Sequence, residues 1–273
     1  MSASSVELRH LDQLRGHETP PSLRAFSTFW YAYKRTWRGS VVTSFLYPLF
    51  YLTAMGVGLG TLVNAHHHLD GVPYVTFIAP GLLAATAMSI GLNESTYPVM
   101  AAIKWLKTYY AMLATPLDVI DVFAGHLAWI GTRVLMVSVI YLGMMAAYGA
   151  VVSPWAILAL PAAILMGLAI AAPVMAFSAA QTNDSGFSVL YRFGYVPLFL
   201  FSGTFFPVSQ LPGWLQVVAV ATPLYHGVAL CRALSLGYGL SLWPDLGHAL
   251  YLFILVIGGA LIGYRNYRRR LIT

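Results

Sequence analysis

Charged residues are scarce in this 273-residue chain, and their scarcity sets its broad class. Only 9% of the residues are charged while 59% are hydrophobic, whereas about a quarter of the residues in a soluble domain are charged. This composition excludes an ordinary soluble domain and indicates a membrane protein with several spans. The single cysteine, Cys231, excludes a framework of disulfides within the chain.

Lysine is rarer than arginine, which excludes one kind of nucleotide site. A P-loop needs lysine directly after glycine in G-x-x-x-x-G-K-[ST]. The chain has only Lys34, Lys104 and Lys107, and none of them follows a glycine. We therefore expect no ATP or magnesium site in this chain. Its first 40 residues also lack a short apolar core followed by small residues, so we expect no cleavable signal peptide.

Acidic residues number nine, and they lie mostly in the N-terminal tail and at expected helix ends. An integral membrane enzyme, such as a lipid-modifying one, needs convergent acid, base or metal groups. An ATP-independent carrier or channel coupled to ions normally uses ionisable groups at mid-membrane. No expected span places an acid there, so the sequence favours neither alternative. We predict no catalytic residue and no metal site; the run His66–His68, with only Asp70 beside it, reads as a polar outer loop rather than a zinc site.

Long apolar stretches are abundant, and six of them are long enough to cross about 30 Å of hydrocarbon. They are residues 41–63, 73–93, 121–148, 154–180, 187–206 and 245–264. The polar segment 1–22 is expected to be a flexible tail. In 23–40, aromatic residues recur at helical spacing beside basic ones, which predicts an amphipathic helix lying in the membrane interface. The predicted fold class is all-α, with six transmembrane helices in a domain over 41–264 and a basic tail over 265–273.

Basic residues indicate the orientation of these spans. Six Lys or Arg precede the first span and four Arg lie in 265–273, whereas the loop after the first span has none. With six crossings and both termini cytoplasmic, in the cytoplasmic (plasma) membrane, every basic cluster is inside and only Arg232 is outside. Pro212 and Pro223 divide 207–236 into pieces too short to span. We therefore predict that this segment is a re-entrant hairpin on the outer face.

Three motifs in this arrangement resemble a known family. They are FSGTFFPVSQLP at 201–212, ATPLYHGVALCRAL at 221–234, and YPVMAAIKWLKTYYAMLATPLDVIDVFAGHLAW at 97–129. Together they are similar to the membrane subunit of ABC-2 type exporters, most of all the permeases of nodulation-type lipo-oligosaccharide exporters and of daunorubicin-resistance exporters. The likeness covers nearly the whole chain from about residue 23.

The resemblance implies a machine made of several chains. In that family two membrane subunits form the pore, and two ATPase subunits bind ATP and magnesium beneath them. This chain is thus expected to export an amphiphilic substrate (a lipid, a glycolipid or a hydrophobic drug) beside a second copy of itself, or a related permease. No nucleic acid partner is expected.

The loop 94–118 is the predicted contact with the ATPase subunit. By resemblance it holds a short helix that passes closure of the ATPase to the spans. Its composition agrees, because cations and bulky aromatic residues are typical of binding hot spots. A membrane-surface helix without this role is the alternative. The candidate coupling residues are Lys104, Trp105, Lys107, Tyr109 and Tyr110.

The substrate path is expected between the two copies, since the resemblance implies that the first, second and fifth spans line it. Aromatic walls suit an amphiphile because tyrosine adds a polar group to an apolar ring. The alternative is that these rings pack or face lipid. The candidates are Phe45, Tyr47, Phe50, Tyr51, Tyr191, Phe193, Tyr195 and Phe199, with Phe205 and Phe206 as an outer gate.

Several residues have two interpretations at this level. Arg133 is expected near the inner interface, with a buried functional arginine as the alternative. Glu94 pairs with a base of the interfacial helix or is a solvated helix-end charge. Asp118 and Asp121 are predicted to begin the third helix, where the helix dipole favours carboxylates. The repeats Gly56/Gly60 and Gly259/Gly263 are weak signals of close helix packing.

Overall fold

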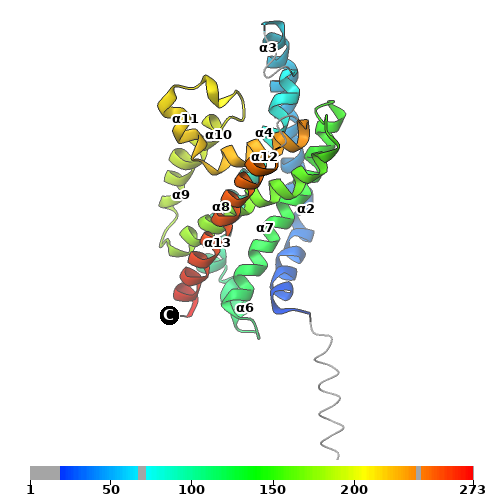
Figure 1. Ribbon diagram of the computed structural model, residues 1–273. Coiled ribbons are helices and arrows are strands. Elements are labelled where there is room, and N and C mark those ends of the chain that lie inside the picture. Colours follow the sequence, from blue (N-terminus) through cyan, green and yellow to red (C-terminus); the bar gives the residue numbers. More distant parts are fainter. Residues whose placement is uncertain (1–18, 67–71, 238–240, 273) are drawn as a thin grey trace, which may run out of the picture.

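The computed structural model describes residues 19–66, 72–237 and 241–272, without the side chains of 40–45, 47–48, 57 and 64–66. All the elements in this part of the chain are helical, as the sequence predicts. Long helices run roughly side by side, with the C-terminus and α6 at one end and α3 at the other (Figure 1). The predicted metal-free loop with His67, His68 and Asp70 lies outside the described residues.

The first described helix joins two segments that the sequence predicted as separate elements, residues 23–40 and 41–63. Helix α2 runs from Pro21 to Thr53 without a break at residue 40, passes through a π-helical turn, η1 (Ala54–Leu59), and continues as α3 (Gly60–His66). The expected interfacial helix and the expected first span are thus one continuous helical rod. Helix α2 packs along α7 (Val119–Ala147).

Four helical stretches among the described residues are long and apolar enough to cross a membrane. They are Tyr74–Trp105, Val119–Ala147, Pro154–Ala180 and Leu242–Ile272. They coincide with the predicted second, third, fourth and sixth spans, so the chain is a multi-pass membrane protein. The predicted fifth span, 187–206, consists of shorter pieces: α9 (Ser185–Val189), the π-helical η4 (Leu190–Tyr195) and α10 (Val196–Phe201).

Helix α8 (Ala159–Ala180) lies at the centre of the bundle, where it packs against both α4 (Tyr74–Ser95) and α13 (Leu242–Ile272). Their facing sides carry small residues, so the backbones approach closely. A β-carbon on Gly259 would lie 2.5 Å from the ring of Pro173 in α8, and one on Gly263 would lie 2.6 Å from Phe123. The repeat Gly259/Gly263 is therefore a real packing face, and only glycine fits it without movement of a neighbour.

The segment after α10 forms two helices joined by a sharp bend. Helices α11 (Gly213–Val220) and α12 (Pro223–Leu236) meet at 80°. Pro223 begins α12, as expected for a residue that lacks an amide hydrogen. In Figure 1 both helices stay in the half of the molecule away from the C-terminus.

The C-terminal end of α12 is bonded to the turn between α7 and α8. Ser235 near its C-terminus accepts hydrogen bonds from the amides of Val152 and Ser153 in the turn between α7 and α8, at 3.1 and 3.0 Å. The bend itself lies against α13, where the Tyr251 hydroxyl donates to the carbonyl of Ala221 at 2.7 Å. Near the C-terminal end of α12, the Arg232 guanidinium lies 3.9 Å from the ring centroid of Phe77 in α4 and donates to the carbonyl of Gly203 at 2.9 Å.

Candidate functional site

The predicted coupling loop is a chain of short helical pieces. Helix α4 bends at Thr96, then α5 (Tyr97–Met100) and the π-helical η2 (Ala101–Trp105) continue it, and α6 (Thr108–Leu113) follows. Lys107 separates η2 from α6 with a φ of 55°. A non-glycine residue in this left-handed region costs about 1–3 kcal/mol and is typical of functional segments. Asp121 then accepts the Asp118 amide at 3.0 Å, which confirms the predicted start of α7.

The coupling residues fall into two groups by exposure. Trp105 is 53% exposed, its neighbour Leu106 is 75% exposed and Tyr110 is 40% exposed. Lys104 and Lys107 are exposed as well. Tyr109, in contrast, is completely buried, so it offers no surface to a partner in this structure. The exposed group forms an apolar and basic edge, and its aromatic residues suit contact with another protein.

This edge is tied to three separate parts of the chain. Lys104 Nζ donates to the carbonyl of Thr182 at 2.9 Å, in the connection between α8 and α9. The Tyr110 hydroxyl donates to the carbonyl of Arg270 at 3.2 Å, near the end of α13. The segment also continues directly from α4. A push on the edge would therefore reach α4, α9 and α13 together.

Beneath the edge lies a buried hydrogen-bonded cluster that sequence reasoning missed. The Tyr109 hydroxyl lies 2.5 Å from His126 Nδ1 in α7 and 3.2 Å from the Tyr267 hydroxyl in α13. Phe29 of α2 stacks on the His126 ring, with centroids 4.4 Å apart. Burial raises the pKa of Tyr109 well above its ordinary value, so its hydroxyl stays protonated and able to donate. Four helices thus meet at Tyr109.

A second buried group joins α2, α4 and α7. Arg133 Nε lies 3.3 Å from Glu94 Oε1, and the guanidinium lies 4.7 Å from the ring of Tyr33. Arg133 is only 8% exposed, so its side chain is enclosed by the helical bundle. Neither interpretation of Glu94 is right, because its partner comes from α7 and not from the N-terminal helix.

The predicted substrate-path residues are partly brought together. Tyr191, Tyr195 and Phe199 follow one another along η4 and α10, with the last two rings stacked 5.7 Å apart. The ring centroid of Phe205 lies 5.1 Å from that of Phe199, and the ring centroid of Tyr51 in α2 lies 6.0 Å from that of Phe205. We call these five residues the aromatic column.

The column is joined to the end of α4. The Tyr191 hydroxyl donates to Asn93 Oδ1 at 2.6 Å and lies 3.1 Å from Thr96 Oγ1, at the bend that begins the coupling segment. Tyr191 therefore links the aromatic residues of the fifth predicted span to the start of the segment that carries Lys104 and Trp105.

The other path candidates lie apart from the column. Phe50 and Phe193 are 64% and 77% exposed. Phe206 is half-buried beside Phe205. The side chains of Phe45 and Tyr47 are outside the described residues.

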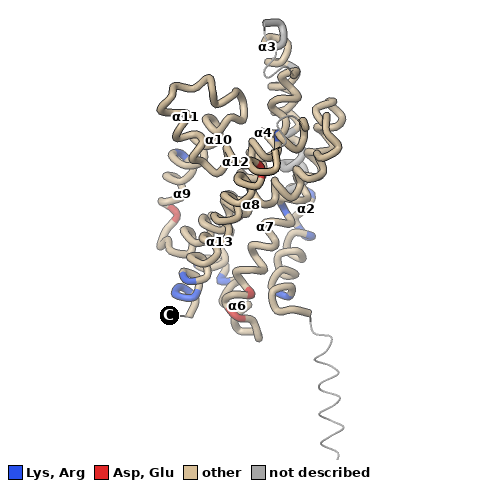
Figure 2. The backbone as a smooth tube through the Cα atoms, viewed as in Figure 1, with Lys and Arg blue, Asp and Glu red and all other residues tan. Residues whose placement is uncertain are grey.

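A metal site needs several His, Cys, Asp or Glu side chains close together. No cluster of three or more His, Cys, Asp or Glu residues with suitable spacing occurs in this part of the chain. The only histidine pair in ring contact there is His226 with His248, whose Nδ1 atoms lie 2.7 Å apart between α12 and α13. Figure 2 shows Lys and Arg gathered at the C-terminal end of α13, while both basic and acidic residues lie beside α6.

Comparison with known proteins gives one family. The profile of the family described as ABC-2 type transporter matches residues 24–236. Nodulation protein J of Rhizobium meliloti is 33% identical over 208 residues, which cover 76% of this chain and 78% of that protein. Nodulation protein J of Rhizobium leguminosarum bv. viciae is 32% identical over 207 residues, with coverage of 76% and 78%. The protein of the same name from Bradyrhizobium diazoefficiens is 30% identical over 227 residues, with coverage of 81% and 84%.

Proposed function

The chain belongs to the ABC-2 type transporter family, and from this membership we propose that it is the membrane subunit of an ATP-driven exporter of an amphiphilic molecule. The matched domain is a permease and has no ATPase activity of its own. ATP and magnesium are bound by a separate ATPase subunit, and two copies of each chain make the complex.

The observation that carries this proposal is that the coupling segment combines an exposed edge with hydrogen bonds to distant parts of the chain. Trp105 and Leu106 stand exposed beside two lysines, while the segment behind them is bonded to Thr182 and Arg270 and continues α4. An exposed edge of this kind gains from a protein partner, because desolvated aromatic and basic anchors contribute most to binding. The edge continues α4, whose end is bonded to Tyr191 of the aromatic column, so a partner's motion is transmitted to the proposed path.

The proposed path runs between two copies of the chain and uses the aromatic column. Tyr51, Tyr195 and Phe199 supply apolar rings, and Phe205 with Phe206 close the outer end. The exposed Phe50 and Phe193 face the second copy or the cargo. The π-helical turns η1 and η4 occur in the two elements that carry these residues. Such turns favour local rearrangement and are frequent at functional sites.

The proposed topology has six spans with both termini cytoplasmic. The gathering of Lys and Arg at the C-terminal end of α13 supports a cytoplasmic assignment of that end (Figure 2). The 80° bend and the hydrogen bonds of α12 to the α7–α8 turn support an outer re-entrant hairpin. Single cysteines in place of Trp214 and Arg268 test this with a membrane-impermeant thiol reagent. The Trp214 position should be labelled only from outside and the Arg268 position only from inside. The native Cys231 is buried and should stay unlabelled.

Purification of the tagged chain in mild detergent tests the function itself. An ATPase subunit should copurify at equal stoichiometry, in a complex with two copies of each chain. Its ATP hydrolysis should rise with an amphiphilic cargo such as a lipid-linked oligosaccharide. Isolation of the chain alone, even with neighbouring genes co-expressed, would remove the basis of the proposal.

An ATP-independent carrier is the second candidate, because Arg133 and Glu94 are an ionisable pair inside the bundle. Transport in vesicles separates the two candidates. A carrier would transport with an ion gradient and without ATP, whereas the exporter would need ATP and would persist when ionophores remove the gradients.

A further inference from the structure

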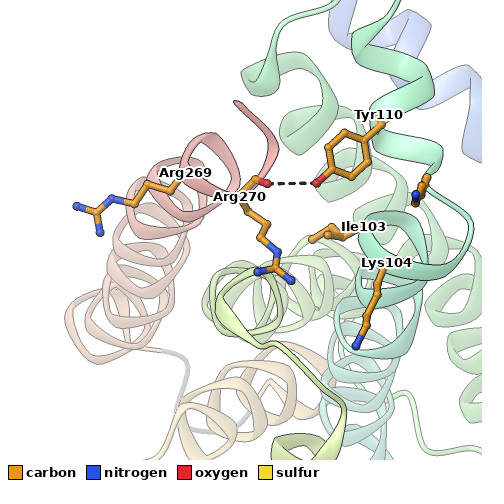
Figure 3. A pocket seen from close by; sticks show the side chains of 6 residues that line it. Ile103, Lys104, Tyr110, Arg269 and Arg270 are labelled. Atoms are coloured by element: carbon orange, nitrogen blue, oxygen red, sulfur yellow. Dashed lines mark hydrogen bonds between the residues drawn. The ribbon is translucent and has the colours of Figure 1, made fainter. Parts of the chain in front are cut away.

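A cavity lies between the coupling segment and the end of α13. Its volume is about 620 Å³, and it is lined by Ile103, Lys104, Lys107, Tyr110, Arg269 and Arg270. In Figure 3 the side chain of Arg270 extends towards Ile103 and Lys104, while Arg269 extends the other way. Residues more than 150 positions apart in the sequence thus form one hollow.

The lining of this cavity is positively charged. Four of its six residues are Lys or Arg, and none is acidic. Like charges around one hollow repel each other and raise the local potential, which attracts an anionic group. Because arginine offers a planar fork of donors, a carboxylate or phosphate oxygen pair fits it well.

The walls of the cavity are held in place before any ligand arrives. Tyr110 donates to the backbone of Arg270, and Lys104 donates to Thr182. Next to Arg270 on α13, Leu271 is buried, and one turn earlier the Tyr267 hydroxyl is hydrogen-bonded to the Tyr109 hydroxyl. The backbone of Arg270 is therefore fixed relative to the coupling segment, so that mainly the Lys and Arg side chains have to be ordered when a ligand binds.

We propose that this cavity is the docking site for an acidic side chain of the ATPase subunit, with Arg270 as its principal cation. The inference rests on the proposed function and extends the contact from the coupling segment to the C-terminal tail. The cavity opens beside Trp105 and Tyr110, the exposed edge assigned to the partner. A carboxylate there bridges α13 to the coupling segment, so that both move with the ATPase.

The position of Arg270 on its helix favours a protein partner over a membrane lipid. Arg265 and Arg268 line a different cavity of about 400 Å³ with Tyr264, Arg269 and Ile272. The side chains of Arg265 and Arg268 are exposed, whereas Arg270 is half-buried. Arg270 is turned instead towards the coupling segment (Figure 3).

A matched pair of charge reversals tests the proposal. Arg270→Glu and Arg268→Glu change charge equally, two residues apart on one helix. The purified ATPase subunit is titrated against the dimeric permease in a neutral detergent without added lipid. We expect Arg270→Glu to weaken binding about tenfold and Arg268→Glu to change it less than twofold, as charge placement at interfaces predicts. Arg270→Gln should be intermediate, and serves in place of Arg270→Glu if that variant fails to elute as a folded dimer.

Rescue identifies the acidic group. A scan of acidic surface residues of the ATPase subunit to lysine should contain one change that restores binding to Arg270→Glu and weakens binding to the wild type. Equal binding of all the permease variants would overturn the inference and leave the exporter proposal intact. A loss seen only in nanodiscs with phosphatidylglycerol, and not in neutral detergent, would also overturn it and assign the cavity to a lipid headgroup. Failure of the wild-type permease to bind the ATPase would instead refute the proposed function.

Discussion

Arg133 and Glu94 form an ion pair inside the helical bundle, with Nε 3.3 Å from Oε1. The two residues lie 39 positions apart, on α7 and at the end of α4. Tyr33 of α2 covers the guanidinium. The pair therefore fixes the rotation of α7 relative to the helix that leads into the coupling segment.

Removal of one partner should cost more than removal of both. Glu94→Gln leaves the Arg133 charge buried without its counter-ion, which costs about 3 kcal/mol, and Arg133→Met leaves the carboxylate in the same condition. The double variant Glu94→Gln/Arg133→Met removes both charges and should recover more than half of the loss. Thermal unfolding in detergent measures all three variants. Additive effects in the double variant would mean that the two side chains do not interact.

Adjacent glycines on α13 should respond oppositely to the same substitution. Gly259→Ala places a methyl group 2.5 Å from Pro173, whereas Gly258 has no neighbour within 4 Å of that position. Overpacking should destabilise Gly259→Ala by about 1–3 kcal/mol. Gly258→Ala should be neutral or gain up to about 1 kcal/mol from helix propensity. Equal melting temperatures for the two variants would contradict the close contact of α13 with α8.

Tyr109→Phe should make the protein less sensitive to alkali. Burial raises the pKa of Tyr109 above its ordinary value of 10.0. Above about pH 10 the unfolded chain loses this proton while the native state keeps it, so the free energy of unfolding falls as the pH rises. Phenylalanine removes that contribution. Its variant should start about 1 kcal/mol less stable at pH 8 for want of the hydrogen bond.

The measurement for Tyr109 is the slope of the melting temperature between pH 8.5 and 11. The slope should be shallower in Tyr109→Phe than in the wild type. Tyr31→Phe is the control, because Tyr31 is 61% exposed and should leave the slope unchanged. Parallel curves for all three proteins would show that Tyr109 is ionised as readily in the native state as in the unfolded chain.

Exposed residues of the coupling segment should affect hydrolysis and leave folding intact. Trp105→Ala and Lys107→Glu should each lower cargo-stimulated ATP hydrolysis at least tenfold, since hot-spot residues contribute about 2 kcal/mol or more and about 1.4 kcal/mol is tenfold. Trp214→Ala is the control, because Trp214 is 71% exposed in the hairpin. Unchanged hydrolysis with normal assembly would assign the segment to the membrane surface. Loss of membrane insertion would make its role structural.

The sequence alone predicted the elements whose cause is local. Residues 121–148 and 154–180 match Val119–Ala147 and Pro154–Ala180 closely, because hydropathy over about 20 residues decides a span. Pro223 predicted the bend of the α11–α12 pair, since proline cannot continue a helix. Asp118 and Asp121 predicted the start of α7, because aspartate is favoured at the N-cap and in the first turn of a helix.

Two boundaries were less accessible to such reasoning. Residue 40 is no helix end, because α2 continues through it from Pro21 to Thr53. The fifth predicted span is divided by the π-helical η4. A π-helical turn has one extra residue but no characteristic amino-acid composition, so hydropathy does not predict it. Tyr109 was grouped with Trp105 and Tyr110 by residue type, although the left-handed Lys107 turns α6 so that Tyr109 points inwards.

By itself the sequence determined that this is a helical membrane protein of the ABC-2 type, where most of its spans lie, and that no lysine of a P-loop is present. Only the tertiary structure decided which polar groups meet. Arg133 pairs with Glu94, 39 positions away, and Tyr109 bonds to Tyr267, 158 positions away. Tyr110 of the coupling segment bonds to the backbone of Arg270. The physical reason is that such pairs depend on the rotation and crossing angle of each helix, which are set by the summed packing of small residues along whole interfaces.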